Sequence, residues 1–209
     1  MHLRRNETPL SWAIPRKGTK FLVVPMHNKR KGIPLLVLMR DIMKVAKTKK
    51  EAKKIIHEEK VKVNTKVVKD EKYPLLLFDI MEIGGKSYKI ILKNRKFSFE
   101  ETKESEKIAK IIGKRALAGN KMQVNLNDGR NFISKEKVST GDSIIIDLKT
   151  GKPVKILPLK KGERIEVIGG KHLGEHGKIE EIDEKNKEAK VTLKDSQINL
   201  KLRDIMAVK

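Results

Sequence analysis

TKKEAKKIIHEEKVKVNTKVV, residues 48–68, decides the fold of the first half of this chain of 209 residues. It opens with Thr48-Lys49-Lys50-Glu51, which has the Ser/Thr-x-x-Glu form of a capping box at a helix N-terminus. The apolar residues that follow repeat at helical spacing: Ala52, Ile55 and Ile56. From residue 61 to 68, apolar and polar residues alternate on both sides of Asn64-Thr65. The stretch therefore predicts a short helix followed by a small β-hairpin.

A second helix is predicted immediately upstream, over residues 35–46. Its apolar residues share one face of a helical wheel: Leu35, Leu38, Met39, Ile42, Met43 and Ala46. Arg40, Lys44 and Lys47 repeat at i, i+4 and i+7 on the opposite face. Two short, closely joined helices pack as a hairpin, so we expect these cations to extend the basic outer arc of the next helix, which carries Lys49, Lys50, Lys53, Lys54 and His57. Two solvated faces are the alternative, but the near absence of acidic residues on both favours binding.

The charge of the chain indicates a polyanionic partner. There are 49 Lys and Arg residues against 27 Asp and Glu, a net charge of +22, and such an excess repels itself unless a partner neutralises it. Residues 1–60 carry 16 basic and 5 acidic residues, net +11, against +6 for residues 61–120 and +5 for residues 121–209. A surface made basic only for solubility would not need this asymmetry, whereas an RNA- or DNA-binding face would.

Composition excludes several other classes of protein. The chain has no Cys, which fits a reducing compartment and excludes disulfides and Cys-based zinc sites. Its longest apolar run, residues 34–39, is far shorter than the roughly 20 residues needed to span a membrane. Arg4 and Arg5 are followed by polar residues and prolines rather than by the apolar segment of a signal peptide. With 38% hydrophobic and 4% aromatic residues, several small modules fit better than one large core.

Residues 1–33 are expected to form an extended basic arm, because Pro9, Pro15 and Pro25 interrupt any long helix. Arms of this kind often become ordered only on binding. Trp12 could stack on a base or a ribose, and packing against the protein's own surface is equally consistent with its position. The cations of the arm that we expect to contact nucleic acid are Arg4, Arg5, Arg16, Lys17, Lys20, Lys29, Arg30 and Lys31.

The remainder of the chain is expected to be mostly β. An apolar stretch from Leu75 to Ile83 predicts a strand that Gly84-Gly85 closes. Short alternating stretches separated by turn signals predict a compact barrel over residues 86–160, with one possible helix over residues 101–113. Residues 161–209 repeat the β pattern.

The sharpest motif is GERIEVIGGKHLGEHGKIEEI, residues 162–182, in which four glycines lie in one loop between two alternating strands. Glycine allows positive φ and close approach of another backbone, so the exposed amides together with Lys171, His172 and His176 could meet phosphate. The two histidines have the spacing of a helical metal pair, but the glycines argue against a helix and no third ligand is evident. The stretch resembles the KOW motif, an RNA- and protein-binding element of ribosomal proteins and transcription factors.

Residues 34–83 resemble an S4-type RNA-binding domain, whose hallmark is a basic helix pair followed by V-x-V-N-G-x-x-V. The corresponding segment here is VKVNTKVV, residues 61–68, with Thr65 where glycine is usual. S4-like domains also occur in RNA-modifying enzymes such as pseudouridine synthases. Those enzymes carry a separate catalytic domain, and this chain shows no paired carboxylates in an apolar context, no Walker loop and no G-x-G-x-x-G.

The order of these segments resembles the S4e family of the archaeal and eukaryotic small ribosomal subunit. The residues that carry the resemblance are HLRR at 2–5 with Trp12, YP at 73–74, FDIMEI at 78–83 and GDSIIIDLKTGK at 141–152. The resemblance implies an archaeal source, a cytoplasmic location in the ribosome, and small-subunit ribosomal RNA and neighbouring ribosomal proteins as partners. It implies no enzymatic activity, cofactor, metal, membrane or small-molecule substrate. The alternative is a free RNA-binding regulator or a KOW-type transcription or translation factor.

We therefore expect an α+β chain of several domains. These are a basic N-terminal arm (1–33), an S4-like helix hairpin with a small sheet (34–85), a central β-barrel-like domain (86–160) and an SH3-like KOW β-barrel (161–209). The residues expected to bind RNA are Trp12 and the named cations of the arm, the helix pair and the KOW loop.

Overall fold

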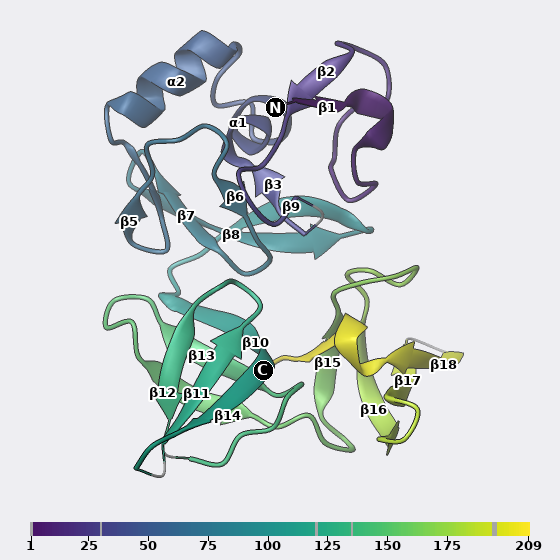
Figure 1. Ribbon diagram of the computed structural model, residues 1–209. Coiled ribbons are helices and arrows are strands. Elements are labelled where there is room, and N and C mark those ends of the chain that lie inside the picture. Colours follow the sequence, from purple (N-terminus) through teal and green to yellow (C-terminus); the bar gives the residue numbers. More distant parts are fainter. Residues whose placement is uncertain (1, 30, 120, 135, 194–195) are drawn as a thin grey trace. The chain divides into compact units, whose positions relative to one another are not determined.

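The structure is a computed structural model that describes residues 2–29, 31–119, 121–134, 136–193 and 196–209 (Figure 1). The chain is mostly β with few helices, and it divides into two compact units, residues 1–105 and residues 106–209. Each unit has its own hydrophobic core, as expected for a chain whose apolar content suits several small modules.

The N-terminal segment is folded rather than extended. Strand β1 (His2–Arg4) pairs antiparallel with β2 (Phe21–Val23), and a short 3-10 helix, η1 (Arg5–Glu7), lies between them. Trp12 is only 2% exposed, and its indole N–H donates to the backbone oxygen of Gly32 at 3.3 Å. The expectation of an extended arm over these residues is therefore wrong, because a buried Trp and a two-stranded ribbon anchor the segment to the first unit.

The first predicted helix is shorter than its apolar pattern indicates. After β3 (Ile33–Pro34), the helix α1 (Leu35–Val37) continues as a single π-helical turn, η2 (Leu38–Ile42), and ends there. All five residues from Leu35 to Met39 are buried. The segment therefore lies within the hydrophobic core and is not an amphipathic helix with one face in solvent. Lys44 has a φ of +56°, which takes the backbone out of the helix.

The second helix, α2 (Lys49–His57), forms as predicted and begins with the predicted cap. The backbone N–H of Glu51 donates to the Thr48 hydroxyl at 3.2 Å, and the N–H of Lys47 donates to the Glu51 carboxylate at 2.8 Å. These bonds satisfy donors that a helix start leaves without intrahelical partners. The bond from Lys47 also lowers the pKa of the Glu51 carboxyl and is the largest cause of that shift.

The first unit contains one five-stranded sheet in the order β5-β4-β7-β8-β9. Its strands are β4 (Val61–Val63), β5 (Lys66–Val67), β7 (Ile80–Ile83), β8 (Lys86–Lys93) and β9 (Lys96–Glu101). The strand predicted over Leu75 to Ile83 is interrupted, because β6 (Pro74–Leu75) pairs instead with β3 and Phe78 has a φ of +64°. The predicted boundary at residue 85 falls between the paired strands β7 and β8, so this sheet runs across it. The four-domain division itself stays a prediction.

The predicted hairpin is confirmed, and a buried polar pair explains its asparagine. Asn64 and Thr65 have φ values of +49° and +70°, which a two-residue turn of type I′ requires. The Asn64 amide N–H donates to Asp79 at 2.8 Å, and the Ile80 N–H donates back to the Asn64 side-chain oxygen at 3.0 Å. Asp79 also accepts the N–H of Leu76 at 2.7 Å. The side chain of Asn64 thus connects the turn to the chain reversal before β7.

The second unit contains two five-stranded sheets. The first, in the order β12-β11-β10-β13-β14, consists of β10 (Glu106–Leu117), β11 (Lys121–Leu126), β12 (Asn131–Ser134), β13 (Ser143–Asp147) and β14 (Pro153–Leu157). The second, in the order β18-β17-β16-β15-β19, consists of β15 (Arg164–Val167), β16 (His176–Asp183), β17 (Glu188–Leu193), β18 (Ser196–Lys201) and β19 (Ile205–Ala207), with a 3-10 turn η3 (Leu202–Asp204) before β19.

The helix considered possible over residues 101–113 is wrong, because β10 covers most of that range. Two buried lysines at core positions obscure its strand pattern. Lys107 lies 2.7 Å from the carboxylate of Asp128, and Lys110 donates to the backbone oxygens of Leu202 and Ile205 at 2.5 Å each. The second interaction joins the two sheets of the unit.

Replacing Asn64 tests the polar pair at the hairpin. Asn64→Ala should lower the free energy of unfolding of the first unit by about 2 kcal/mol, because it removes one donor from the buried Asp79 and the acceptor of the Ile80 N–H. Urea unfolding followed by the fluorescence of Trp12, the one tryptophan of the chain, measures this loss.

Asn94→Ala is the matched control, because Asn94 begins the β8–β9 turn with a φ of +51° but is exposed. It should cost much less than Asn64→Ala. Equal losses from the two variants would mean that the backbone preference of asparagine, and not the bond to Asp79, explains the effect.

The Lys107–Asp128 pair predicts acid sensitivity in the second unit. Burial acts to raise the pKa of Asp128, but the Lys107 ammonium, together with the backbone N–H and the charge of Arg130, outweighs it and holds the pKa below the usual 3.8. A carboxylate with a depressed pKa stabilises the fold above its unfolded pKa and loses that contribution as the pH falls through the folded value. Hydrogen exchange of the β10 and β13 amides, corrected for intrinsic rates, should therefore lose protection from about pH 4 downward.

Asp128→Asn should lower this protection at pH 7 and flatten its dependence on acid. An acid dependence identical to that of the unchanged chain would show that Asp128 is not the group responsible.

Candidate nucleic-acid interface

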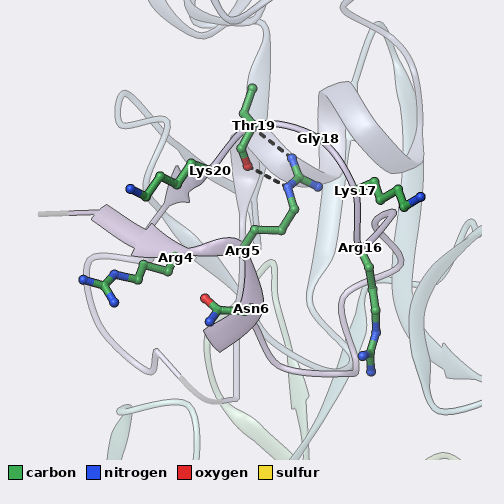
Figure 2. A pocket seen from close by; sticks show the side chains of 8 residues that line it. All are labelled: Arg4, Arg5, Asn6, Arg16, Lys17, Gly18, Thr19 and Lys20. Atoms are coloured by element: carbon green, nitrogen blue, oxygen red, sulfur yellow. Dashed lines mark hydrogen bonds between the residues drawn. The ribbon is translucent and has the colours of Figure 1, made fainter.

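Five of the predicted arm cations line one open pocket in the first unit (Figure 2). The pocket, of about 600 Å³, is lined by Arg4, Arg5, Asn6, Arg16, Lys17, Gly18, Thr19 and Lys20. Arg4, Arg16, Lys17 and Lys20 are exposed, and Lys20 also lies 5.4 Å from the centre of the Phe21 ring. The β1–β2 pairing brings the two ends of this loop together and thereby gathers charges that are up to 16 residues apart in the sequence.

Arg5 differs from the other arginines of the pocket. Its Nε donates to the backbone oxygen of Thr19 at 2.7 Å, and Nη1 donates to that of Pro15 at 2.7 Å. Nη2 donates to the Thr19 hydroxyl at 3.0 Å. Three of its five N–H donors are therefore engaged within the loop.

The remaining predictions for the arm have mixed outcomes. Lys29 and Lys31 are exposed but do not line the pocket. Arg30 lies outside the described residues. Trp12 is buried, so the structure does not support its stacking on RNA. It has the other of the two predicted arrangements, in which Trp12 packs against the protein itself. Tertiary packing decides between these alternatives, which the local sequence leaves open.

Helix α2 carries the second group of cations. A buried carboxylate contacts some of these cations and leaves the others unpaired with it. Glu71 is buried and lies 2.9 Å from the Lys49 ammonium and 3.8 Å from that of Lys53. Lys50 and Lys54 are exposed, and neither has a carboxylate within 4.0 Å in the part of the chain that the structure describes. Lys50 and Lys54 are thus the cations of α2 that remain available to an external anion.

The basic row predicted on the preceding helix does not form. Arg40 makes a two-pronged contact with its neighbour Asp41, at 3.0 and 2.8 Å, and this bond raises the pKa of its guanidinium. Lys44 and Lys47 are exposed, but both lie beyond the last helical residue, Ile42. The helical spacing of these three cations therefore has no counterpart in the structure, because the helix ends before two of them.

The arm and α2 belong to one framework. Leu36 of α1 and Ala52 of α2 pack in the same core cluster, with Val23 of β2 against it. In Figure 1, α2 and the β1–β2 ribbon lie above the five-stranded sheet with α1 between them. The two cationic groups of the first unit are therefore held by shared packing rather than by a flexible connection.

The glycine-rich loop of the second unit has the predicted form, between β15 and β16. Lys171 and His176 are exposed, whereas His172 directs its Nδ1 toward Glu175 at 3.2 Å. Gly177 is required here, because a side chain at this position would meet the backbone oxygen of Thr192 in the neighbouring strand. Lys171 and His176 are the members of the predicted trio that remain open to solvent.

The exposed groups of both units are suited to binding phosphate. Lysine and arginine side chains provide charge-assisted donors, and phosphate contacts position a nucleic acid more than they read its sequence. Over the described residues, no cluster of three His, Asp or Glu side chains is arranged to hold a metal ion. Nor does any described helix have the length and apolar character needed to cross a membrane.

Sequence reasoning overlooked Gly18 and Thr19 as parts of the first site. Thr19 accepts two of the Arg5 bonds, and Gly18 has a φ of +142° with the Arg5 guanidinium against it. The Arg-Lys-Gly-Thr-Lys run at residues 16–20 is the available signal, because a glycine next to a threonine within a basic segment indicates a tight turn among the cations.

The fold and the site define an RNA-binding protein built from known ribosomal modules. Residues 34–80 match the S4 domain, residues 161–194 match the KOW motif, and residues 85–153 match the ribosomal family S4e. A small ribosomal subunit protein eS4 from Methanocella arvoryzae is 39% identical over 188 residues, which cover 87% of this chain and 80% of the relative. The chain belongs to the S4e family of ribosomal proteins.

Further relatives agree with this assignment. The eS4 protein of Archaeoglobus fulgidus is 37% identical over 186 residues, covering 86% of this chain and 79% of that protein. Among solved structures, the 30S ribosomal protein S4e of Thermoplasma acidophilum superposes with a TM-score of 0.76 at 25% identity, covering 86% of this chain and 96% of that one.

Paired substitutions on α2 separate the available cations from those held by Glu71. Lys50→Ala with Lys54→Ala should weaken binding to small-subunit ribosomal RNA without changing the melting temperature. The slope of log affinity against log salt concentration should become shallower by the amount expected for the loss of about two phosphate contacts. Lys49→Ala with Lys53→Ala removes the same charge but should affect RNA binding less and lower the melting temperature, because it leaves the buried Glu71 without its cations.

Filter binding at several salt concentrations and thermal unfolding of the two double variants measure these effects. If both double variants lost the same affinity and had the same stability, the proposed difference between the lysines held by Glu71 and the exposed lysines Lys50 and Lys54 would be wrong.

Proposed function

We propose that this chain is a structural constituent of the small ribosomal subunit that binds small-subunit ribosomal RNA and supports its folding and assembly. The observation that carries the proposal is the likeness to proteins named small ribosomal subunit protein eS4 along more than four-fifths of the chain. The net charge of +22 supports it independently, because the chain contains far too few carboxylates to neutralise its own cations.

The mechanism is docking rather than chemistry. The pocket cations of the arm and the exposed lysines of α2 contact phosphates of the RNA backbone, and the KOW loop adds a second contact through Lys171 and His176. Contacts carried by two units of one chain reinforce one another, because binding of one raises the effective concentration of the other. Neighbouring ribosomal proteins are the further partners, and the site of action is the ribosome in the cytoplasm.

The finer architecture belongs to the same proposal. We infer that the two sheets of the second unit close into small barrels, the second of them of the SH3-like type usual for KOW modules. The described pairing supports this in part, because each sheet has five antiparallel strands and a compact core of its own. On this reading the chain acts as a non-enzymatic scaffold.

Fractionation of a cell extract on a sucrose gradient tests the proposal. The chain should sediment with the small ribosomal subunit in a one-to-one ratio with its other proteins, and it should stay there after a wash in moderate salt. A chain found only near the top of the gradient would favour the alternative, a free RNA-binding regulator or KOW-type factor.

A further inference from the structure

The pocket of the arm is constructed around a single side chain. The backbone N–H of Arg5 donates to the oxygen of Lys20 at 2.9 Å, and its guanidinium reaches across the loop to Pro15 and Thr19. The Thr8 hydroxyl donates to the Arg5 oxygen at 2.6 Å, which fixes the opposite side of the same residue. Arg5 is therefore held by its backbone and holds the loop through its side chain.

Gly18 fits this arrangement closely. A Cβ at position 18 would lie 2.8 Å from Nη2 and 2.9 Å from Cζ of Arg5, so any larger residue must displace the guanidinium. The φ of +142° at Gly18 also disfavours other residues. The loop closes around Arg5 only because this position has no side chain.

The other cations of the pocket are directed outward. Figure 2 shows Arg5 pointing toward Thr19, while Arg4 and Lys20 extend to one side of the loop and Arg16 and Lys17 extend away from it. Arg4, Arg16 and Lys17 have no carboxylate within 4.0 Å among the described residues. Four outward-directed cations on one loop can contact several phosphates of a polyanion, whereas one or two of them would saturate a single small anion.

We propose that residues 4–20 form a preorganised binding site for the phosphodiester backbone of RNA, in which Arg5 is a positioning residue and Arg4, Arg16, Lys17 and Lys20 contact the phosphates. The inference rests on the proposed function, since RNA is the partner, and it changes the expected role of Arg5 from a direct contact to a support. A loop fixed before binding loses less conformational entropy in the complex than a disordered arm would.

The assignment predicts that the shape of the loop matters as well as its charge. Gly18→Ala removes no charge but should displace Arg5, so it should weaken binding to a small-subunit ribosomal RNA transcript by about tenfold. Arg5→Lys keeps the charge, but a single ammonium nitrogen cannot reach the three acceptors that the separate guanidinium nitrogens reach, so it should cause a similar loss.

Two control variants isolate the effect. Arg95→Lys makes the same exchange at an exposed arginine of the first unit that does not line the pocket, and it should leave affinity unchanged. Gly85→Ala places the same substitution at another positive-φ glycine of the first unit, φ +79°, where no atom lies within 4 Å, and it should also leave affinity unchanged. Trp12 fluorescence reports whether each variant is folded.

A double-mutant cycle gives the decisive readout. If Arg5 positions the loop, Arg16→Ala with Lys17→Ala should cost much less affinity in the Arg5→Lys background than in the unchanged chain, because those contacts are already lost. Additive losses, or an Arg5→Lys or Gly18→Ala variant that binds as tightly as the unchanged chain, would overturn the positioning role. An unchanged chain that does not bind the transcript at all would instead contradict the proposed function.

Discussion

The main constraint on the structure is an excess of positive charge that the chain's own carboxylates cannot neutralise. Several of its buried carboxylates are committed internally, among them Glu71 to lysines of α2, Asp79 to Asn64, and Asp128 to Lys107. Each of these contacts serves the fold, so the acidic groups that could neutralise surface cations are further reduced in number. The surplus of positive charge remains at the surface, where water screens it, and an anionic partner of matching extent neutralises it on binding.

The N-terminal segment is folded in the structure, whereas its charge alone would suggest a disordered arm. A basic, proline-containing N-terminus is typical of arms that fold on binding, but here Trp12 and the β1–β2 ribbon anchor the segment to the core that also supports α2. The cations of the first unit are therefore displayed on a fixed frame. A fixed frame favours recognition of folded RNA by shape, which is how proteins recognise most helical RNA.

Local signals in the sequence predicted the parts of the fold that local physics controls. The Thr48 cap, the turn at Asn64-Thr65 and the glycine-rich loop each depend on residues within a few positions of one another, and each is present. The burial of Trp12, the strand β10 and the early end of the first helix depend on distant partners. Lys110 illustrates the limit, because its acceptors at residues 202 and 205 are more than 90 positions away.

The site was predicted at the level of segments rather than of individual side chains. The sequence located the basic arm, α2 and the KOW loop, since charge density is visible in composition. It could not distinguish Lys50 from Lys49, or Arg5 from Arg4, because the difference lies in a buried carboxylate and in the acceptors of a closed loop. Identical residue types in adjacent positions therefore make different contacts, for reasons that only the folded chain reveals.

The salt dependence of binding tests the central claim most directly. The affinity of the full chain for small-subunit ribosomal RNA should fall steeply as salt rises from about 50 to 200 mM, with a log–log slope of about −4 to −5 if roughly six cations each neutralise one phosphate. A slope near zero would contradict the account, because it would mean that the surplus charge does not contact the RNA backbone.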